Sequence, residues 1–158
     1  MSDYSDPFCH TASIEIAAPT DVVLDVVSDG LRQGDWALGS QHRRAGDEEG
    51  VFIGISWFDG GETFVRPVPD KDRLYVHYEV GRSAADALQP RNVVRIVPGP
   101  VIGLAEDRCV ATLMTWRDAS ASDDRWRMTC VSHKTEMYRI RHLAEARAKT
   151  DTKEEVKD

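Results

Sequence analysis

Two residues near the C-terminal end of the chain, Cys130 and His133, could do chemistry or hold a ligand. An imidazole titrates near neutral pH, so His133 could move a proton or anchor a hydroxyl or carbonyl group of a ligand. Two interpretations of His133 stay open. It is either a structural histidine that bonds to a strand or a water, or a polar anchor that points into a cavity.

The same two residues supply only part of a metal site. Cys9 and His10 could add ligands, but the spacing of the four residues matches no standard zinc pattern. The segment "PGPVIG" at 98–103 lacks the glycine order of a phosphate loop, and no basic residue directly follows it. We therefore expect no metal and no cofactor.

Two arginines, Arg66 in "TFVRPV" and Arg95 in "VVRIV", lie among apolar neighbours. Charges inside such segments usually point outward to solvent. If Arg66 instead faces inward, it needs a partner, and His77 and Glu79 are the candidates. An inward arginine would favour a ligand that carries a carboxylate or a polarised oxygen.

Large aromatic side chains gather in the middle of the sequence. Most belong to an ordinary core, because aromatic residues dominate burial in a small domain, and a few could contact a ligand. Strand parity alone does not say which ones. The set comprises Trp36, Trp57, Phe58, Phe64, Tyr75, Tyr78 and Trp116.

The composition is that of one soluble globular domain. The chain has 158 residues, 41% of them hydrophobic and 30% charged, with a formal net charge of -7. An acidic chain is a poor partner for a nucleic-acid backbone or an anionic membrane surface. We expect neither as a partner.

The cysteines and the N-terminal segment bear on the cellular compartment in which the protein resides. Three cysteines at wide spacings make no disulfide framework, which favours a reducing environment. Residues 1–10 contain no apolar leader, and no window approaches the roughly 18 apolar residues of a membrane span. We expect a cytoplasmic protein with a flexible N-terminal segment at 1–10.

The segment "SIEIAAPTDVVLDVVSD" at 13–29 changes its hydrophobic period at Pro19. Alternation before the proline predicts a strand. After it, valines recur at three- to four-residue spacing, Pro19 suits the first helical position, and Asp21 suits the first turn. Residues 30–40 are long enough only for a second short helix or a turn-rich connection.

The pattern of residues 41–116 predicts an antiparallel meander. Apolar or β-branched runs alternate with turn clusters such as "AGDEEG", "DGG" and "PDKDR". In "LYVHYEV" at 74–80, Leu74, Val76, Tyr78 and Val80 share one face, opposite Tyr75, His77 and Glu79. Together with the first strand, about seven strands are predicted.

A long amphipathic helix closes the chain. One apolar stripe steps by three and four residues through Trp126, Cys130, His133, Met137, Ile140 and Ala144. Ser122 can cap the helix start, and the other faces carry charged residues, Glu136 among them. Residues 149–158 have one aliphatic side chain, so we expect a disordered charged tail.

The connections at 59–61, 81–91 and 118–124 should fall at one end of the meander, beside the start of the closing helix. The connection at 81–91 is long and rich in small residues. We expect it to be a mobile lid, with Ala87 and Leu88 as an apolar flap, at the mouth of any cavity.

The order of these elements resembles the START-like helix-grip superfamily, which includes lipid-transfer domains and bacterial polyketide cyclases and aromatases. The segments that carry the resemblance are "IEIAAPTDVVLDVVSD", "GDWALGS", "CVATLMTW" and "HKTEMYRIRHLAEAR". It implies an α+β helix-grip fold over a single domain at 11–148. In that fold a seven-stranded antiparallel sheet wraps around the long C-terminal helix, and two short helices follow the first strand.

The resemblance implies a cavity between sheet and helix, but no particular reaction. Three functions stay open: a carrier or sensor of a small, largely hydrophobic molecule such as a lipid or polyketide, a cyclase, aromatase or dehydratase, and a protein-interaction module. The enzyme reading would use His133, His77 or Tyr78 for proton transfer. The oligomeric state stays open. The expected ligand-binding residues are Trp36, Trp57, Phe64, Arg66, His77, Tyr78, Trp116, His133 and Met137.

Overall fold

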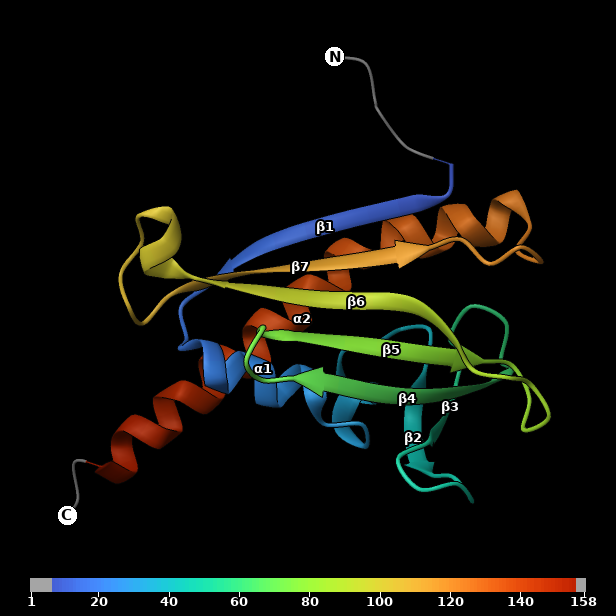
Figure 1. Ribbon diagram of the computed structural model, residues 1–158, viewed down its shortest axis with the longest axis horizontal. Helices are drawn as coiled ribbons and strands as arrows, with labels where there is room; N and C mark the ends of the chain where they lie inside the picture. Colours follow the sequence, from blue (N-terminus) through green and yellow to red (C-terminus); the bar gives the residue numbers. More distant parts are fainter. Residues whose placement is uncertain (1–6, 156–158) are drawn as a thin grey trace.

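A computed structural model describes the backbone of residues 7–155 and the side chains of residues 7–152. Over the described residues, seven strands form one antiparallel sheet, and two α-helices and two short 3-10 helices complete the fold (Figure 1). This confirms the predicted α+β helix-grip architecture. In chain order the elements are β1 (Cys9–Ile16), α1 (Thr20–Ser28), η1 (Arg32–Asp35), β2 (Gln41–Ala45), β3 (Phe52–Ile55), β4 (Glu62–Asp70), β5 (Tyr75–Gly81), β6 (Gln89–Pro98), η2 (Gly99–Ile102), β7 (Cys109–Trp116) and α2 (Asp123–Glu155).

Strands β2 to β7 form a meander, and the first strand, β1, pairs with the last strand, β7. The order of the sheet is β1-β7-β6-β5-β4-β3-β2, so β2 to β7 are each paired with their neighbours in sequence. Strand β1 pairs with β7 in a continuous register from Cys9 opposite Trp116 to Ile16 opposite Cys109. The sheet curves, and helix α2 lies across its concave side (Figure 1).

Helix α1 follows β1 after a short turn, as the change of period at Pro19 predicts. Pro19 occupies the N-cap, one residue before the expected first helical position, and its carbonyl accepts the Val23 N–H. Val23, Leu24 and Val27 are buried. Their burial docks α1 on the end of the sheet and beside α2, and η1 then leads the chain into β2.

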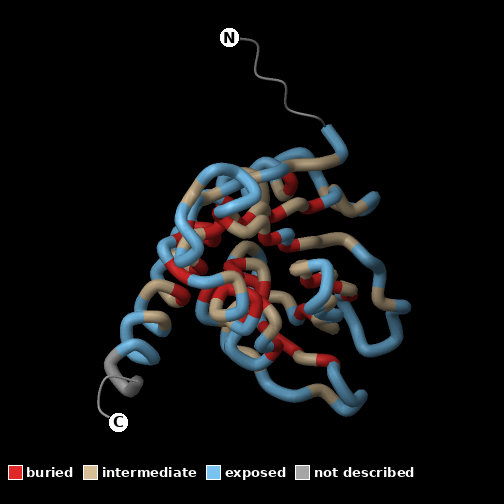
Figure 2. Tube along the Cα trace, turned by 60° about the vertical axis from the view of Figure 1, so that its left-hand side comes forward, coloured by how far each residue is buried: buried red, intermediate tan, exposed pale blue. Residues whose placement is uncertain are grey.

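Helix α2 begins where the sequence predicts. The Ser122 hydroxyl accepts the Arg125 N–H at 3.2 Å, and the Ser122 carbonyl accepts the Trp126 N–H at 2.9 Å. His133, Met137, Ile140 and Ala144 of the predicted stripe are buried. Figure 2 shows the buried residues gathered in the interior, between the sheet and the helices.

Both ends of the described chain are more regular than the sequence indicates. Strand β1 already includes Cys9 and His10, which fall in the segment expected to be flexible, because both pair with β7. Helix α2 continues to Glu155, through most of the segment expected to be a disordered tail. Extending a formed helix fixes one residue per added hydrogen bond, and Ala and Lys propagate it well. Residues 1–6 and 156–158 of these two predicted segments lie outside the described residues.

No helix in the described part of the chain is long and apolar enough to cross a membrane.

Candidate functional site

A cavity of about 120 Å³ lies between the sheet and the N-terminal half of α2. Its walls come from η1 and the segment after it, from β2 and the β3–β4 connection, from β4, β5, β6 and β7, and from α2. The cavity is therefore where the helix-grip architecture leaves the sheet and the helix apart.

Strand parity decides which side chains reach the cavity, because neighbouring residues of a strand point to opposite faces. On β4, Thr63 and Val65 line it. On β5 the lining residues are Tyr78 and Val80, and on β7 they are Leu113 and Thr115. These three strands thus contribute every second residue, whereas β6 contributes the adjacent Arg91 and Asn92, where its register with β5 shifts.

Three of the nine residues predicted for ligand binding line the cavity: Trp36, Tyr78 and His133. The rings of Trp36 and Tyr78 meet edge to face with their centroids 6.1 Å apart. The Tyr78 hydroxyl donates a hydrogen bond to the Val27 carbonyl at 2.6 Å, and burial raises the pKa of this phenol. Tyr78 thereby ties the sheet to α1, and its proton is already engaged.

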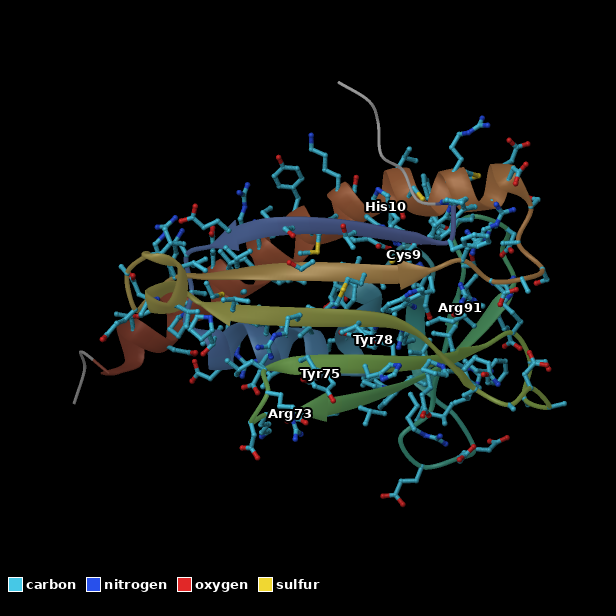
Figure 3. All side chains as sticks on the ribbon, turned by 45° about the horizontal axis from the view of Figure 1, so that its top comes forward. Cys9, His10, Arg73, Tyr75, Tyr78 and Arg91 are labelled. Carbon is cyan, nitrogen blue, oxygen red and sulfur yellow. The ribbon has the colours of Figure 1, made fainter. Side chains whose placement is uncertain are left out.

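His133 has a partner on the first strand. Its Nδ1 lies 2.6 Å from Nδ1 of His10, so one of the two rings donates and the other accepts. Burial, and next the proximity of His10, lower the pKa of His133 to about 4. The imidazole is therefore neutral at neutral pH, and it both bonds to a strand and borders the cavity. Its bond to His10 agrees with the structural interpretation, and its place on the cavity wall is the position that the second interpretation requires. Figure 3 labels His10 on β1, the strand next to α2.

Phe64 and Met137 are buried without bordering the cavity. Phe64 points away from Thr63 and Val65 and packs with Val51 and Ile53 in a separate small cluster on the other side of the sheet. Met137 belongs to the main core under the helix. Both contribute to packing at these positions.

The remaining four predicted residues lie on the outer surface. Trp57 and Trp116 are 67% and 42% exposed. Arg66 donates to Glu79 at 2.9 Å and also pairs with Glu48, so it faces outward with its partners. His77 shares the outer face of β5 with Glu79. The alternation in "LYVHYEV" already separates His77 from Tyr78, since an inward Tyr78 requires an outward His77.

The helix pattern predicts Glu136 on a charged outer face of the closing helix, but the structure places it on the cavity wall. Its side chain is buried, and its Oε1 accepts the Leu38 N–H at 2.8 Å. Burial raises the pKa of this carboxyl to about 7, against the lowering effect of the Leu38 and Gly39 N–H groups. The sequence signal for its inward position is its spacing of three residues from His133, because residues three apart lie on the same side of a helix.

Four buried polar atoms have no hydrogen-bond partner among the described residues: Gln33 Oε1, Trp36 Nε1, Asn92 Oδ1 and Arg125 Nη1. All four residues line the cavity. Gln33 and Trp36 are only 4% and 3% exposed. Buried polar groups without partners are costly, so the cavity wall carries donors and acceptors that a water or a ligand could bond.

At the end of the sheet where three connections meet, the cavity is lined by Phe58, Arg82, Arg91 and Arg125, and we call this end its mouth. Arg82 pairs with Asp59 at 2.8 Å, and Arg91 pairs with Asp118 at 3.1 Å. Arg125, in the first turn of α2, lies over the Phe58 ring at 4.2 Å. Figure 3 labels Arg91 on β6 near this end. The expected flap residue Leu88 packs on the cluster around Phe64, so that end of the loop is anchored.

The sheet, the long helix across it and the cavity between them define a helix-grip protein. The chain has the START-like form of that fold. A START superfamily protein from Mycobacterium smegmatis has a TM-score of 0.56 at 12% identity, covering 90% of this chain and 98% of its own. The Zhui aromatase/cyclase from Streptomyces sp. R1128 has a TM-score of 0.65 at 18% identity, covering 88% and 94%.

A third solved structure, the protein XoxI from Bacillus cereus, has a TM-score of 0.65 at 13% identity and covers 85% of this chain and 94% of its own. Comparison with protein-family models and with curated protein sequences gives no match. At these identities the likeness concerns the fold.

Proposed function

We propose that this protein binds a small organic molecule in the cavity between the sheet and α2, as a carrier or sensor. The observation that carries the proposal is the set of four buried, unpartnered polar atoms, all on residues that line this cavity. Val65, Val80 and Leu113 provide apolar wall between these polar groups. Such a lining suits a ligand with an apolar body and a few polar groups.

The size of the cavity limits the ligand. An apolar cavity of about 150 Å³ admits benzene. The present cavity, at about 120 Å³, is on the scale of one ring or a short chain. A lipid or a polycyclic polyketide, the ligands suggested by the sequence, would require the mouth to widen or part of the ligand to remain outside.

Filling the cavity tests this proposal. Val80→Phe places a larger side chain on the lining, whereas Val93→Phe makes the same change on β6 beside the lining residue Asn92, at a position that does not line the cavity. Benzamide should raise the Tm of the wild type and of Val93→Phe, but not that of Val80→Phe. Equal shifts for the two variants would place benzamide binding elsewhere and contradict the proposal.

A second candidate function is an enzyme of the cyclase, aromatase or dehydratase kind. The specific observation in its favour is that two groups able to transfer protons, His133 and Glu136, line one cavity a single helical turn apart. At neutral pH the imidazole is a free base, and the carboxyl is part protonated. Enolisation and dehydration need such a base and acid within reach of one substrate.

Hydrogen–deuterium exchange into a bound ketone separates this candidate from simple binding. Wild-type protein in D₂O should speed the exchange at the carbon next to the carbonyl of phenylacetone, and Glu136→Gln and His133→Leu should each reduce that rate. If phenylacetone binds but exchanges no faster than in buffer, the enzymatic candidate fails while the binding proposal stands.

A further inference from the structure

The charges around the cavity are opposite in sign to those of the whole chain. The chain carries a formal net charge of -7. Four arginines nevertheless line the cavity, Arg43, Arg82, Arg91 and Arg125, and Glu136 is the one carboxyl of the lining among the described residues. A cationic interior in an acidic protein needs a reason beyond solubility.

Two of these arginines have carboxylate partners. Arg82 pairs with Asp59 and Arg91 with Asp118, and these side chains are all 24–42% exposed. Asp86 accepts the N–H groups of Arg82 and Ser83 from the exposed loop. These two ion pairs are close to neutral, so Arg43 and Arg125, which have no carboxylate of their own, decide the sign of the charge in the cavity.

Arg125 is incompletely paired. Its Nε lies 4.0 Å from Asp59, an acid that Arg82 already holds at 2.8 Å. Its Nη2 reaches the Ser56 hydroxyl at 3.5 Å, and its Nη1 is buried without a partner among the described residues. The Phe58 ring covers the guanidinium face. Nη1 is thus a fixed donor beside the cavity that still requires an acceptor.

Arg43, on β2, has no carboxylate within ion-pair distance in the described part of the chain. Its Nε donates to the Ser40 carbonyl at 3.2 Å and its Nη1 to the Gly30 carbonyl at 3.3 Å. Burial lowers the pKa of this guanidinium to about 10, so it is still a cation at neutral pH. A desolvated cation of this kind is stabilised by an anion placed in the cavity.

We infer that the ligand of this cavity is an organic anion, a carboxylate on a body of about one ring, with the carboxylate bound by Arg125. This inference rests on the proposed binding function and narrows it. A planar carboxylate offers two acceptor oxygens, and a guanidinium edge can bind both. Trp36 Nε1 and the part-protonated Glu136 carboxyl add donors to the same cavity.

The test compares pairs of probes that differ in charge and little in shape. Benzoate and benzamide form the first pair, phenyl phosphate tests a tetrahedral anion, and titration calorimetry gives each Kd. The variants are Arg125→Gln, which removes the charge, and Arg125→Lys, which keeps it. Arg127→Gln, two residues away with a 75% exposed side chain, is the matched control.

Wild-type protein should bind benzoate about tenfold more tightly than benzamide, a difference of about 1.4 kcal/mol. Arg125→Gln should bring the two affinities together by weakening benzoate and leaving benzamide unchanged. Arg125→Lys should keep part of the preference, and Arg127→Gln all of it. If phenyl phosphate binds more tightly than benzoate, the ligand is still an anion, but the inference that it is a carboxylate is wrong.

The inference fails if benzamide binds as tightly as benzoate, or if Arg125→Gln keeps the preference; in either case cavity binding as such survives. If no probe binds, neutral or charged, the proposed function fails together with the inference. Thermal melting of each variant without probe separates a loss of folding from a loss of binding, and Arg43→Gln supplies a second test of the charge if Arg125→Gln does not fold.

Discussion

Glu136 and His133 lie one turn apart on α2, and burial moves their pKa values in opposite senses. The carboxyl titrates at about 7 and the imidazole at about 4. Between these values both groups are mainly uncharged, because burial penalises the charged form of each. The helix thus carries two titratable groups in the interior at little electrostatic cost over that pH range.

Replacing Glu136 by Gln should change how stability depends on pH. The pKa of the carboxyl is raised from its ordinary 4.5 to about 7, so the folded state binds more protons than the unfolded state between these values. The wild type should lose on the order of 3 kcal/mol as pH rises through this window. Gln stays neutral and can still accept the Leu38 N–H.

Denaturant melts at pH 5 and pH 8 check this prediction. The difference in unfolding free energy between Glu136→Gln and the wild type should grow in favour of the variant at pH 8. The exposed Glu106→Gln serves as the control and should show no such change. A difference that is the same at both pH values would show that the Glu136 carboxyl is not perturbed.

Replacing His133 by Leu should have the opposite pH dependence. The pKa of His133 is lowered from 6.5 to about 4, so the wild type loses stability as pH falls through this window. Near pH 8 the variant should be less stable by roughly 1–2 kcal/mol, because His10 loses its partner. At pH 5 the deficit should vanish, since Leu cannot be protonated. The same loss of unfolding free energy at pH 5 and at pH 8 would contradict this prediction. The control is His142→Leu, on the exposed face of α2.

At the scale of the element, helix α2 is stabilised by its buried stripe and not by its length. Met137 and Ile140 are 1% and 0% exposed and lie in the main core. Val131, on the same helix, is 69% exposed. The stripe packs against the sheet, while the last turns carry mainly exposed side chains.

Replacing Met137 or Ile140 by Ala should therefore lower the unfolding free energy by about 2–5 kcal/mol. The loss combines the lost burial with the cavity left behind. Val131→Ala should cost well under 1 kcal/mol. Urea melts of the three variants check this, and a neutral result at both core positions would show that the sheet does not grip the helix there.

At the scale of the whole molecule, the two ends of the sheet differ. One end is filled by α1 and the core beneath α2, and at the other the connections at 59–61, 82–88 and 118–122 surround the cavity mouth. Residues 82–87 are exposed. The contacts that join these connections are surface ion pairs, which individually contribute little.

Hydrogen exchange should follow this division. Amides of β5, β6 and β7 and of α2 around Ile140 should be the most protected, whereas residues 83–87 should exchange close to the rate of an unstructured chain. Saturating benzoate should slow exchange at the mouth and leave the far end unchanged. If residues 83–87 prove as protected as the strands, the connection is not a mobile lid.

The sequence by itself determined the order of the elements and much of the core. The change of period at Pro19, the alternation in "LYVHYEV" and the stripe from Trp126 to Ala144 each record local geometry, since side-chain periodicity follows directly from the backbone. The same alternation placed Tyr78 and His77 on opposite faces. Which of the two faces inward was decided only when the sheet curved around α2.

The site was decided by the tertiary structure. Glu136 is adjacent in sequence to the apolar stripe and resembles a surface acid, until the segment after η1 covers it and donates the Leu38 N–H. Gln33, Asn92 and Arg125 are spread over more than ninety residues and read as ordinary polar positions. They become a site because folding buries one polar atom of each beside a common cavity without giving it a partner, and such a deficit exists only in three dimensions.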